Sequence, residues 1–212
     1  MSEVADLQSA ARGMNLALDD ASARRIVRFV DVLEIWNQRV RLTGDRDRRT
    51  ILAKHVVDSL APCRWLPVDG LVGDIGSGGG FPGIVVACAR PDLRVSLIEA
   101  RRRPCSFLSE VSRTIPLPRV RVINARAEEA ASDPSLGGQA DIVMSRAVRL
   151  DAVMALGAPL LAPHGRVIAM RTPSGVAEED AILAGSAFRR IDEFAYCLAD
   201  GSKRRIVLLD RA

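Results

Sequence analysis

The chain has 212 residues, of which 48% are hydrophobic, and this composition allows one globular body with a full core. Its net charge of +4 is compatible with a nucleic-acid partner, while its four cysteines form no CxxC pair, which argues against a disulfide framework or a metal site. No apolar run approaches the roughly 18 residues of a membrane span, and the N-terminal segment lacks the order of a signal peptide, so we expect a cytoplasmic protein without membrane contact.

Two amphipathic helices are predicted before the first strand. Apolar residues recur at helical spacing from Ala21 to Val40, and Asp19, Asp20 and Ser22 are suitable N-caps. A second helix is predicted from Arg49 to Leu60, where Pro62 ends it. We expect residues 1–66 to form a helical cap on a second unit, residues 67–212, within one compact body.

Alternating strands and helices are predicted over the rest of the chain, which is typical of a doubly wound α/β fold with a mostly parallel seven-stranded sheet. The short turn at 199–202 leaves no room for a crossover helix, so the last two strands are expected to pair antiparallel. The predicted strands are 71–75, 94–99, 120–124, 141–145, 165–170, 193–198 and 204–210, and the predicted helices are 83–90, 103–115, 150–161 and 177–187.

The glycine-rich segment 71–83, LVGDIGSGGGFPG, is the strongest functional signal. A buried strand that ends in such a turn leaves backbone N–H groups accessible, with no Cβ to keep a ligand away. About 25 residues after Asp74, a second apolar run ends in Glu99, at the distance that α/β nucleotide-binding folds use for a carboxylate on ribose hydroxyls. The pair predicts a site for an adenosine-containing ligand.

Arginines gather in two stretches of the chain. These arginines could form an ordinary solvated surface, or they could form an RNA-binding face. Because only 4% of residues are aromatic, RNA would be held mainly through phosphate contacts and shape. The richer stretch contains one acid, Glu110, against Arg101, Arg102, Arg103, Arg113, Arg119, Arg121 and Arg126.

Several motifs in order resemble the glucose-inhibited division protein B family. They are HVVDSL at 55–60, DIGSGGGFPG at 74–83, NARAEE at 124–129 and SRA at 145–147. The resemblance covers about residues 36–209. It implies a class I methyltransferase (Rossmann-like) fold, S-adenosylmethionine as cofactor, and transfer of a methyl group to N7 of one guanine of 16S ribosomal RNA, with the RNA or the small-subunit particle as partner.

The resemblance also implies roles for particular residues. Gly76, Gly78 and Phe81 would contact the cofactor in the turn, and Glu99 would hold the ribose. Asp58 would touch the cofactor or orient the turn, or else belong with His55 to a local helix-docking network. The adenine would lie beside Ala127 and Glu128, although Glu128 also reads as a surface acid.

Arg146 is expected at the mouth of the site, as a clamp on substrate or cofactor or in a structural ion pair with Asp141 or a nearby acid. Guanine N7 is an exposed lone pair and releases no proton on methylation, so a general base is not required. We assign RNA contacts to Arg103, Arg171 and Arg204. Arg171 stands where relatives usually carry a lysine, which keeps the charge and changes its geometry.

Three alternatives stay open. A methyltransferase of this class could act on a small molecule or a protein, and a binding module could retain the fold without turnover. A nicotinamide-dependent oxidoreductase would need a GxGxxG turn leading into a helix, which Pro82 and the run of glycines fit poorly. We favour a monomeric RNA methyltransferase.

Overall fold

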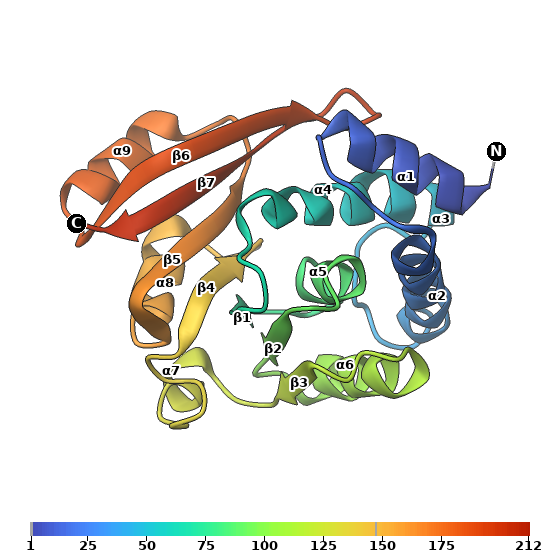
Figure 1. Ribbon diagram of the computed structural model, residues 1–212, viewed down its shortest axis with the longest axis horizontal. Helices are drawn as coiled ribbons and strands as arrows, with labels where there is room; N and C mark the ends of the chain where they lie inside the picture. Colours follow the sequence, from blue (N-terminus) through green and yellow to red (C-terminus); the bar gives the residue numbers. More distant parts are fainter. Residues whose placement is uncertain (1, 147) are drawn as a thin grey trace.

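The computed structural model describes residues 2–146 and 148–212, and one mixed sheet runs through it (Figure 1). The strand order is β3-β2-β1-β4-β5-β7-β6, in which only β7 runs against its neighbours. This is the predicted seven-stranded sheet with its antiparallel hairpin. Its strands are β1 (Leu71–Ile75), β2 (Arg94–Ile98), β3 (Val120–Ile123), β4 (Ala140–Ser145), β5 (Leu161–Arg171), β6 (Phe188–Cys197) and β7 (Lys203–Arg211).

Strands β5 and β6 are longer than predicted. β5 begins four residues before 165 because Leu161 pairs with Ala140, ahead of an irregularity in the ladder with β4. β6 begins at Phe188, where the chain pairs with the end of β7. Because β5 already starts at Leu161, the helix predicted to reach that residue ends at Gly157.

Helices cover both faces of the sheet (Figure 1). The N-terminal helices lie on the side of α5 and α6, whereas α7, α8 and α9 lie on the other side. The 83–90 and 103–115 predictions are confirmed to within a residue, and α7 is an additional short helix. The bounds are α5 (Gly83–Ala89), α6 (Arg102–Thr114), α7 (Ala127–Ala130), α8 (Leu150–Gly157) and α9 (Val176–Ala184).

The N-terminal segment is more helical than predicted. α1 (Glu3–Gly13) precedes α2 (Asp20–Asn37), whose N-cap is the predicted Asp19, with its side chain accepting from Ser22 N. The helix predicted from Arg49 to Leu60 is present but irregular, because it passes through a π-helical segment, η1 (Ile51–Val56). Its flanking parts are α3 (Arg48–Thr50), α4 (Val57–Leu60) and the 3-10 helix η2 (Ala61–Trp65).

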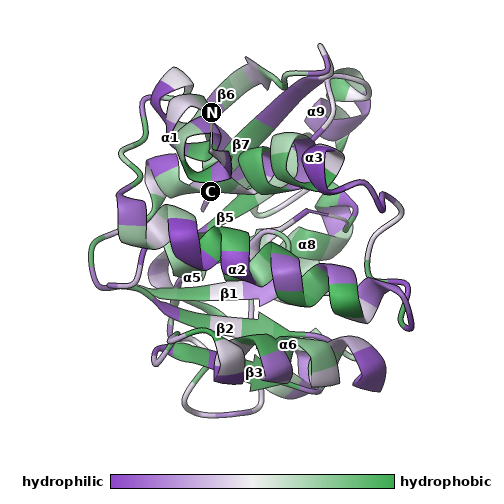
Figure 2. Ribbon diagram, turned by 90° about the vertical axis from the view of Figure 1, so that its right-hand side faces the viewer, coloured by the Kyte–Doolittle hydropathy of each residue, from purple (hydrophilic) through white to green (hydrophobic). Residues whose placement is uncertain are grey.

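The first helices share one apolar core with the sheet. Phe29 of α2 and Phe107 of α6 are fully buried, with ring centroids 6.3 Å apart, in the cluster that also contains Val72 of β1. Figure 2 shows α2 in front of the strands, with hydrophobic and hydrophilic residues alternating along it. The boundary at residue 66 stays a prediction. Among the described residues, no helix is both long and apolar enough to cross a membrane.

Candidate active site at the glycine-rich turn

The glycine-rich turn follows β1 at the carboxyl edge of the parallel strands. Gly76 and Gly78 have φ angles of +75° and +47°, which residues with a Cβ rarely adopt. Among the described residues, a Cβ built on Gly76 would have only the Val148 side chain within 4 Å, at 3.7 Å, so these residues leave the outer side of the turn open. Ser145 donates to Ile75 O at 2.9 Å and fixes the end of β4 beside the turn.

Asp74 shapes the turn from below. Its Oδ2 accepts from Gly83 N at 3.1 Å, where a side chain would collide with Asp74 itself. The carboxyl is 1% exposed, and Oδ1 has no hydrogen-bond partner in the described residues. Burial raises the pKa of Asp74 to about 7, from an ordinary value of 3.8. Asp74 therefore organises the turn rather than facing the ligand.

This raised pKa predicts a pH dependence of stability. The folded protein holds the Asp74 proton more tightly than the unfolded chain, so the stabilisation is complete below about pH 4 and is lost as pH rises through about 7. We expect the free energy of unfolding of the wild type, relative to Asp74→Asn, to fall by roughly 4 kcal/mol over that range. Urea unfolding of both proteins at several pH values measures it. A difference that stays constant with pH would contradict the prediction.

Glu99 reaches the turn from the end of β2. Its Oε2 accepts from Gly78 N at 3.0 Å, and its Oε1 accepts from the backbone N and the Nε of Arg101 at 2.8 and 3.1 Å. The side chain is 5% exposed, whereas that of Arg101 is 70% exposed and extends over Gly78. Asn124 Nδ2 donates to Glu99 O at 3.0 Å and holds the ends of β2 and β3 together. The predicted pairing of Glu99 with the turn is thus present in space.

Phe81 and Arg146 form the other side of the turn. The Phe81 ring packs edge-on against Phe29, with centroids 5.3 Å apart, and the Arg146 guanidinium carbon lies 5.6 Å from the Phe81 centroid. Arg146 Nε is 3.2 Å from Asp58 Oδ2. The predicted structural ion pair is therefore formed with a nearby acid, Asp58, and not with Asp141, whose carboxylate accepts instead from Leu71 N at 2.7 Å. Ala147, the last residue of the SRA motif, lies outside the described residues.

Asp58 joins Arg146 to the terminal hairpin. Its side chain is 5% exposed, and the Tyr196 hydroxyl on β6 donates to its Oδ1 at 2.6 Å. Burial raises the pKa of Tyr196, and the Asp58 charge adds to this effect, so the hydroxyl keeps its proton. Asp58 is therefore occupied by a structural network, which favours the predicted docking role over contact with a ligand.

His55 completes this network on the side of the N-terminal helices. Arg146 Nη2 lies 2.5 Å from His55 Nδ1, and His55 Nε2 lies 2.7 Å from Asp45 Oδ2. Because a guanidinium only donates, Nδ1 accepts and Nε2 carries the proton. Burial lowers the pKa of His55, and the Arg146 cation adds to the lowering. His55 is neutral, with both ring nitrogens engaged, as the local-network interpretation predicts.

The remaining predicted residues lie around this centre. Ala127 is buried in the first turn of α7, and Glu128 beside it is exposed, as either interpretation of Glu128 requires. Arg103 is exposed near the start of α6, and Arg204 on β7 is half-buried, paired in register with Tyr196. Arg171 at the end of β5 donates from Nε to Glu179 at 2.7 Å. The RNA-binding roles of these arginines stay predictions.

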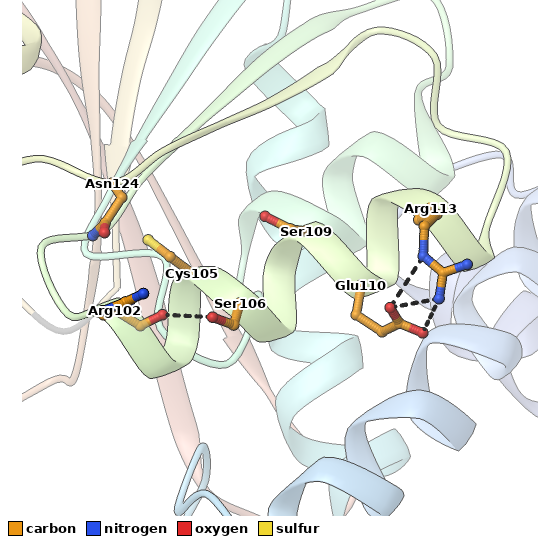
Figure 3. Close-up of a pocket in the computed structure, with 7 residues that line it drawn as sticks. All are labelled: Arg102, Cys105, Ser106, Ser109, Glu110, Arg113 and Asn124. Carbon is orange, nitrogen blue, oxygen red and sulfur yellow. Dashed lines mark hydrogen bonds and ion pairs between the residues drawn. The ribbon is translucent and has the colours of Figure 1, made fainter.

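A surface groove accompanies the outer face of α6 (Figure 3). Glu110 and Arg113 form an ion pair near one end of it, and Asn124 lies at the other end, next to the base of the site. Its volume is about 480 Å³, but it lies beside the turn and not over it. It is lined by Arg102, Cys105, Ser106, Ser109, Glu110, Arg113 and Asn124.

Solved structures with the same fold define the class. The chain superposes on the crystal structure of the M1A22 tRNA methyltransferase TrmK of B. subtilis with a TM-score of 0.59 at 15% identity, covering 76% of this chain and 66% of that one. For a SAM-dependent methyltransferase from Aquifex aeolicus, the TM-score is 0.58 at 13% identity, over 77% of this chain and 93% of that one. With the strand order, these likenesses confirm the class I methyltransferase fold.

Sequence comparison then gives the family. Residues 22–201 match the family described as GidB, rRNA small subunit methyltransferase G, and the chain belongs to this family. The ribosomal RNA small subunit methyltransferase G of Roseiflexus sp. (strain RS-1) is 38% identical over 175 residues, 82% of this chain and 74% of the relative. The protein of that name from Desulfotalea psychrophila is 33% identical over 215 residues, 96% of each chain.

The turn suits S-adenosylmethionine, the cofactor of this class. Gly76 and Gly78 add no side chain of their own to its outer side, and the Glu99 carboxylate beside them can accept hydrogen bonds from ribose hydroxyls. Sequence reasoning did not assign Tyr196, Asp45 or Asn124 to the site. The NARAEE motif contained the one available signal, Asn124, whereas nothing in the local pattern marks Tyr196 or Asp45.

Proposed function

We propose that the chain is an S-adenosylmethionine-dependent methyltransferase that methylates N7 of a guanine in 16S ribosomal RNA. The observation that carries the proposal is the Glu99 carboxylate bonded to Gly78 N at the glycine-rich turn of a chain that belongs to the GidB family. The 16S RNA or the small-subunit particle is the partner. We further propose that the protein acts in the cytoplasm as a monomer.

The cofactor would be held by Gly76, Gly78 and Phe81 at the turn and by Glu99 at the ribose. When bound, it supplies a sulfonium methyl group that a purine nitrogen can accept directly. Binding of ribose hydroxyls by Glu99 replaces its side-chain contact with Arg101, whose exposed side chain is free to move into solvent. Ala127 and Glu128 would flank the adenine.

The transfer needs no general base, because N7 carries no proton. The surroundings of His55 support this step, since both of its ring nitrogens are already engaged, by Arg146 and by Asp45, and neither is free to take a proton from a substrate. During methylation, positive charge develops on the purine, and a bare arginine nearby would oppose it. Asp58 compensates the Arg146 cation, so Arg146 can orient Phe81 and the turn without that penalty. Catalysis then depends on positioning, which can contribute about 7 to 11 kcal/mol.

Methyl transfer to RNA from a strain that lacks the gene tests this function. We expect the purified protein to transfer labelled methyl groups to small-subunit RNA from the deletion strain, and not to RNA from the parent strain, whose site is already methylated. Borohydride and aniline cleavage locates N7-methylguanine in the product. Persistence of the cleavage site in the deletion strain would refute the RNA assignment.

A further inference from the structure

A second cavity, of about 440 Å³, lies at the carboxyl ends of β4 and β5, between the first turns of α8 and α9. In Figure 1, these helices lie side by side on the face of the sheet opposite the N-terminal helices. The size is within the usual range for small-molecule pockets. Its polar lining consists of Arg149, Asp151, Arg171, Thr172, Ser174, Glu178 and Glu179, and no residue of the glycine-rich turn is among the described residues that line it.

Among the described residues, Val148 links this cavity to the turn. Its side chain is the closest described group to the Cβ position of Gly76, at 3.7 Å, and its carbonyl accepts from Arg171 Nη1 at 3.3 Å. The cavity and the cofactor-binding turn therefore share a wall.

The rear of the cavity is built from fixed charges. Glu179 is 2% exposed and accepts from Arg171 Nε at 2.7 Å and from Arg205 on β7. Arg205 Nε also donates to Thr172 O at 3.1 Å, which fixes the start of the loop before α9. This network is compensated internally, so the Arg171 guanidinium keeps its place without a ligand.

The part of the cavity lined by Arg149 and Glu178 contains both hydrogen-bond donors and a carboxylate acceptor. Arg149 forms a two-point ion pair with Asp151, with distances of 3.2 and 3.1 Å. Glu178 is exposed and, within residues 2–146 and 148–212, makes no hydrogen bond or ion pair. A carboxylate that faces a cavity without a partner suits a ligand with two adjacent N–H donors.

We infer that this cavity receives the target guanine, an inference that rests on the proposed function. Glu178 accepts from guanine N1–H and the N2 amino group, and Arg149 and Arg171 present donors to O6. N7 is then left on the edge of the base that faces Val148 and Gly76. Adenine has an acceptor at N1 in place of the N–H, so the same carboxylate rejects it. Since the base-pairing edge is occupied by protein, the guanine enters unpaired.

The test measures single-turnover methyl transfer to unmethylated small-subunit RNA at saturating S-adenosylmethionine. We expect Glu178→Gln to lower the rate roughly 10- to 100-fold, the range for losing a two-point base contact, while cofactor affinity stays unchanged. The matched control is Asp180→Asn, which removes a carboxylate of the same helix that pairs with Arg190 outside the cavity. This control should stay within twofold of the wild type.

Inosine in place of the target guanine separates base recognition from a structural role, because it lacks the N2 amino group. We expect inosine to slow the wild type, and to slow Glu178→Gln much less. A Glu178→Gln rate within twofold of the wild type, or an equal inosine penalty in both proteins, would overturn the inference while leaving the proposed function intact. Absence of transfer by the wild type to any RNA would refute the proposed function and this inference together.

Discussion

Replacement of Asp58 by alanine is expected to lower the free energy of unfolding by about 3 to 5 kcal/mol. The substitution leaves the largely buried Arg146 cation without its carboxylate and the Tyr196 hydroxyl without its acceptor. Removing one member of a buried ion pair costs more than removing both, because it leaves an uncompensated charge. Urea unfolding at neutral pH measures the loss.

The double variant Asp58→Ala/Arg146→Met distinguishes this cause from lost packing. With neither charge present, most of the lost stability should return. The control is Asp20→Ala, which breaks the exposed Arg24–Asp20 pair and should change the stability by no more than about 1 kcal/mol. A double variant as unstable as Asp58→Ala alone would show that the charge of Arg146 is not responsible.

Replacement of Glu99 by glutamine is expected to weaken S-adenosylmethionine binding by roughly 100-fold, or about 3 kcal/mol. The carboxylate has two acceptor oxygens beside the turn, whereas an amide has one oxygen and directs an NH₂ group at donors. In the free protein, the same change leaves either Gly78 N or Arg101 N without its present acceptor. Isothermal titration calorimetry gives the affinity directly.

The control for this variant is Glu110→Gln on α6, which removes an acid paired with exposed Arg113 at the far end of the groove in Figure 3. Its affinity for the cofactor should equal that of the wild type. Because Glu99 also supports the turn, the melting temperature of each variant must be compared with that of the wild type, to show that the variant is folded. Wild-type affinity in a folded Glu99→Gln protein would mean that the ribose is held elsewhere.

The sheet and the turn could be predicted because their signals are local. A buried parallel strand appears in the sequence as a short apolar run, and Gly76, Gly78 and Gly80 occupy positions where the backbone has positive φ angles. Parallel neighbours bring the ends of β1 and β2 together, so the spacing of Asp74 and Glu99 in the chain became proximity in space. Helix α1 escaped prediction because its apolar stripe is narrow, with only Leu7 and Ala11 buried.

The polar network of His55, Asp58, Arg146 and Tyr196 could not be predicted from the spacing of these residues in the sequence. Tyr196 and Asp58 are 138 residues apart, and Arg146 and His55 are 91 apart. No periodic pattern connects such positions, so the sequence could predict an ion pair of Arg146 with an acid but named Asp141, a near neighbour in the sequence, where the structure has Asp58. The π-helical segment η1 was missed for a similar reason, since one extra residue in a helical turn changes the apolar spacing very little.

A series of polar contacts connects the segment before β1 to the terminal hairpin. It runs through the side chains of Asp45, His55, Arg146, Asp58 and Tyr196 in that order. Three of its five members precede residue 67, so a fragment that begins there would carry Arg146 with neither of its neighbours and Tyr196 with no acceptor. The helices before β1 thus behave as part of the machinery that keeps the transfer site in shape. Shortening the protein from its amino end would remove these three side chains before it removed any residue of the glycine-rich turn.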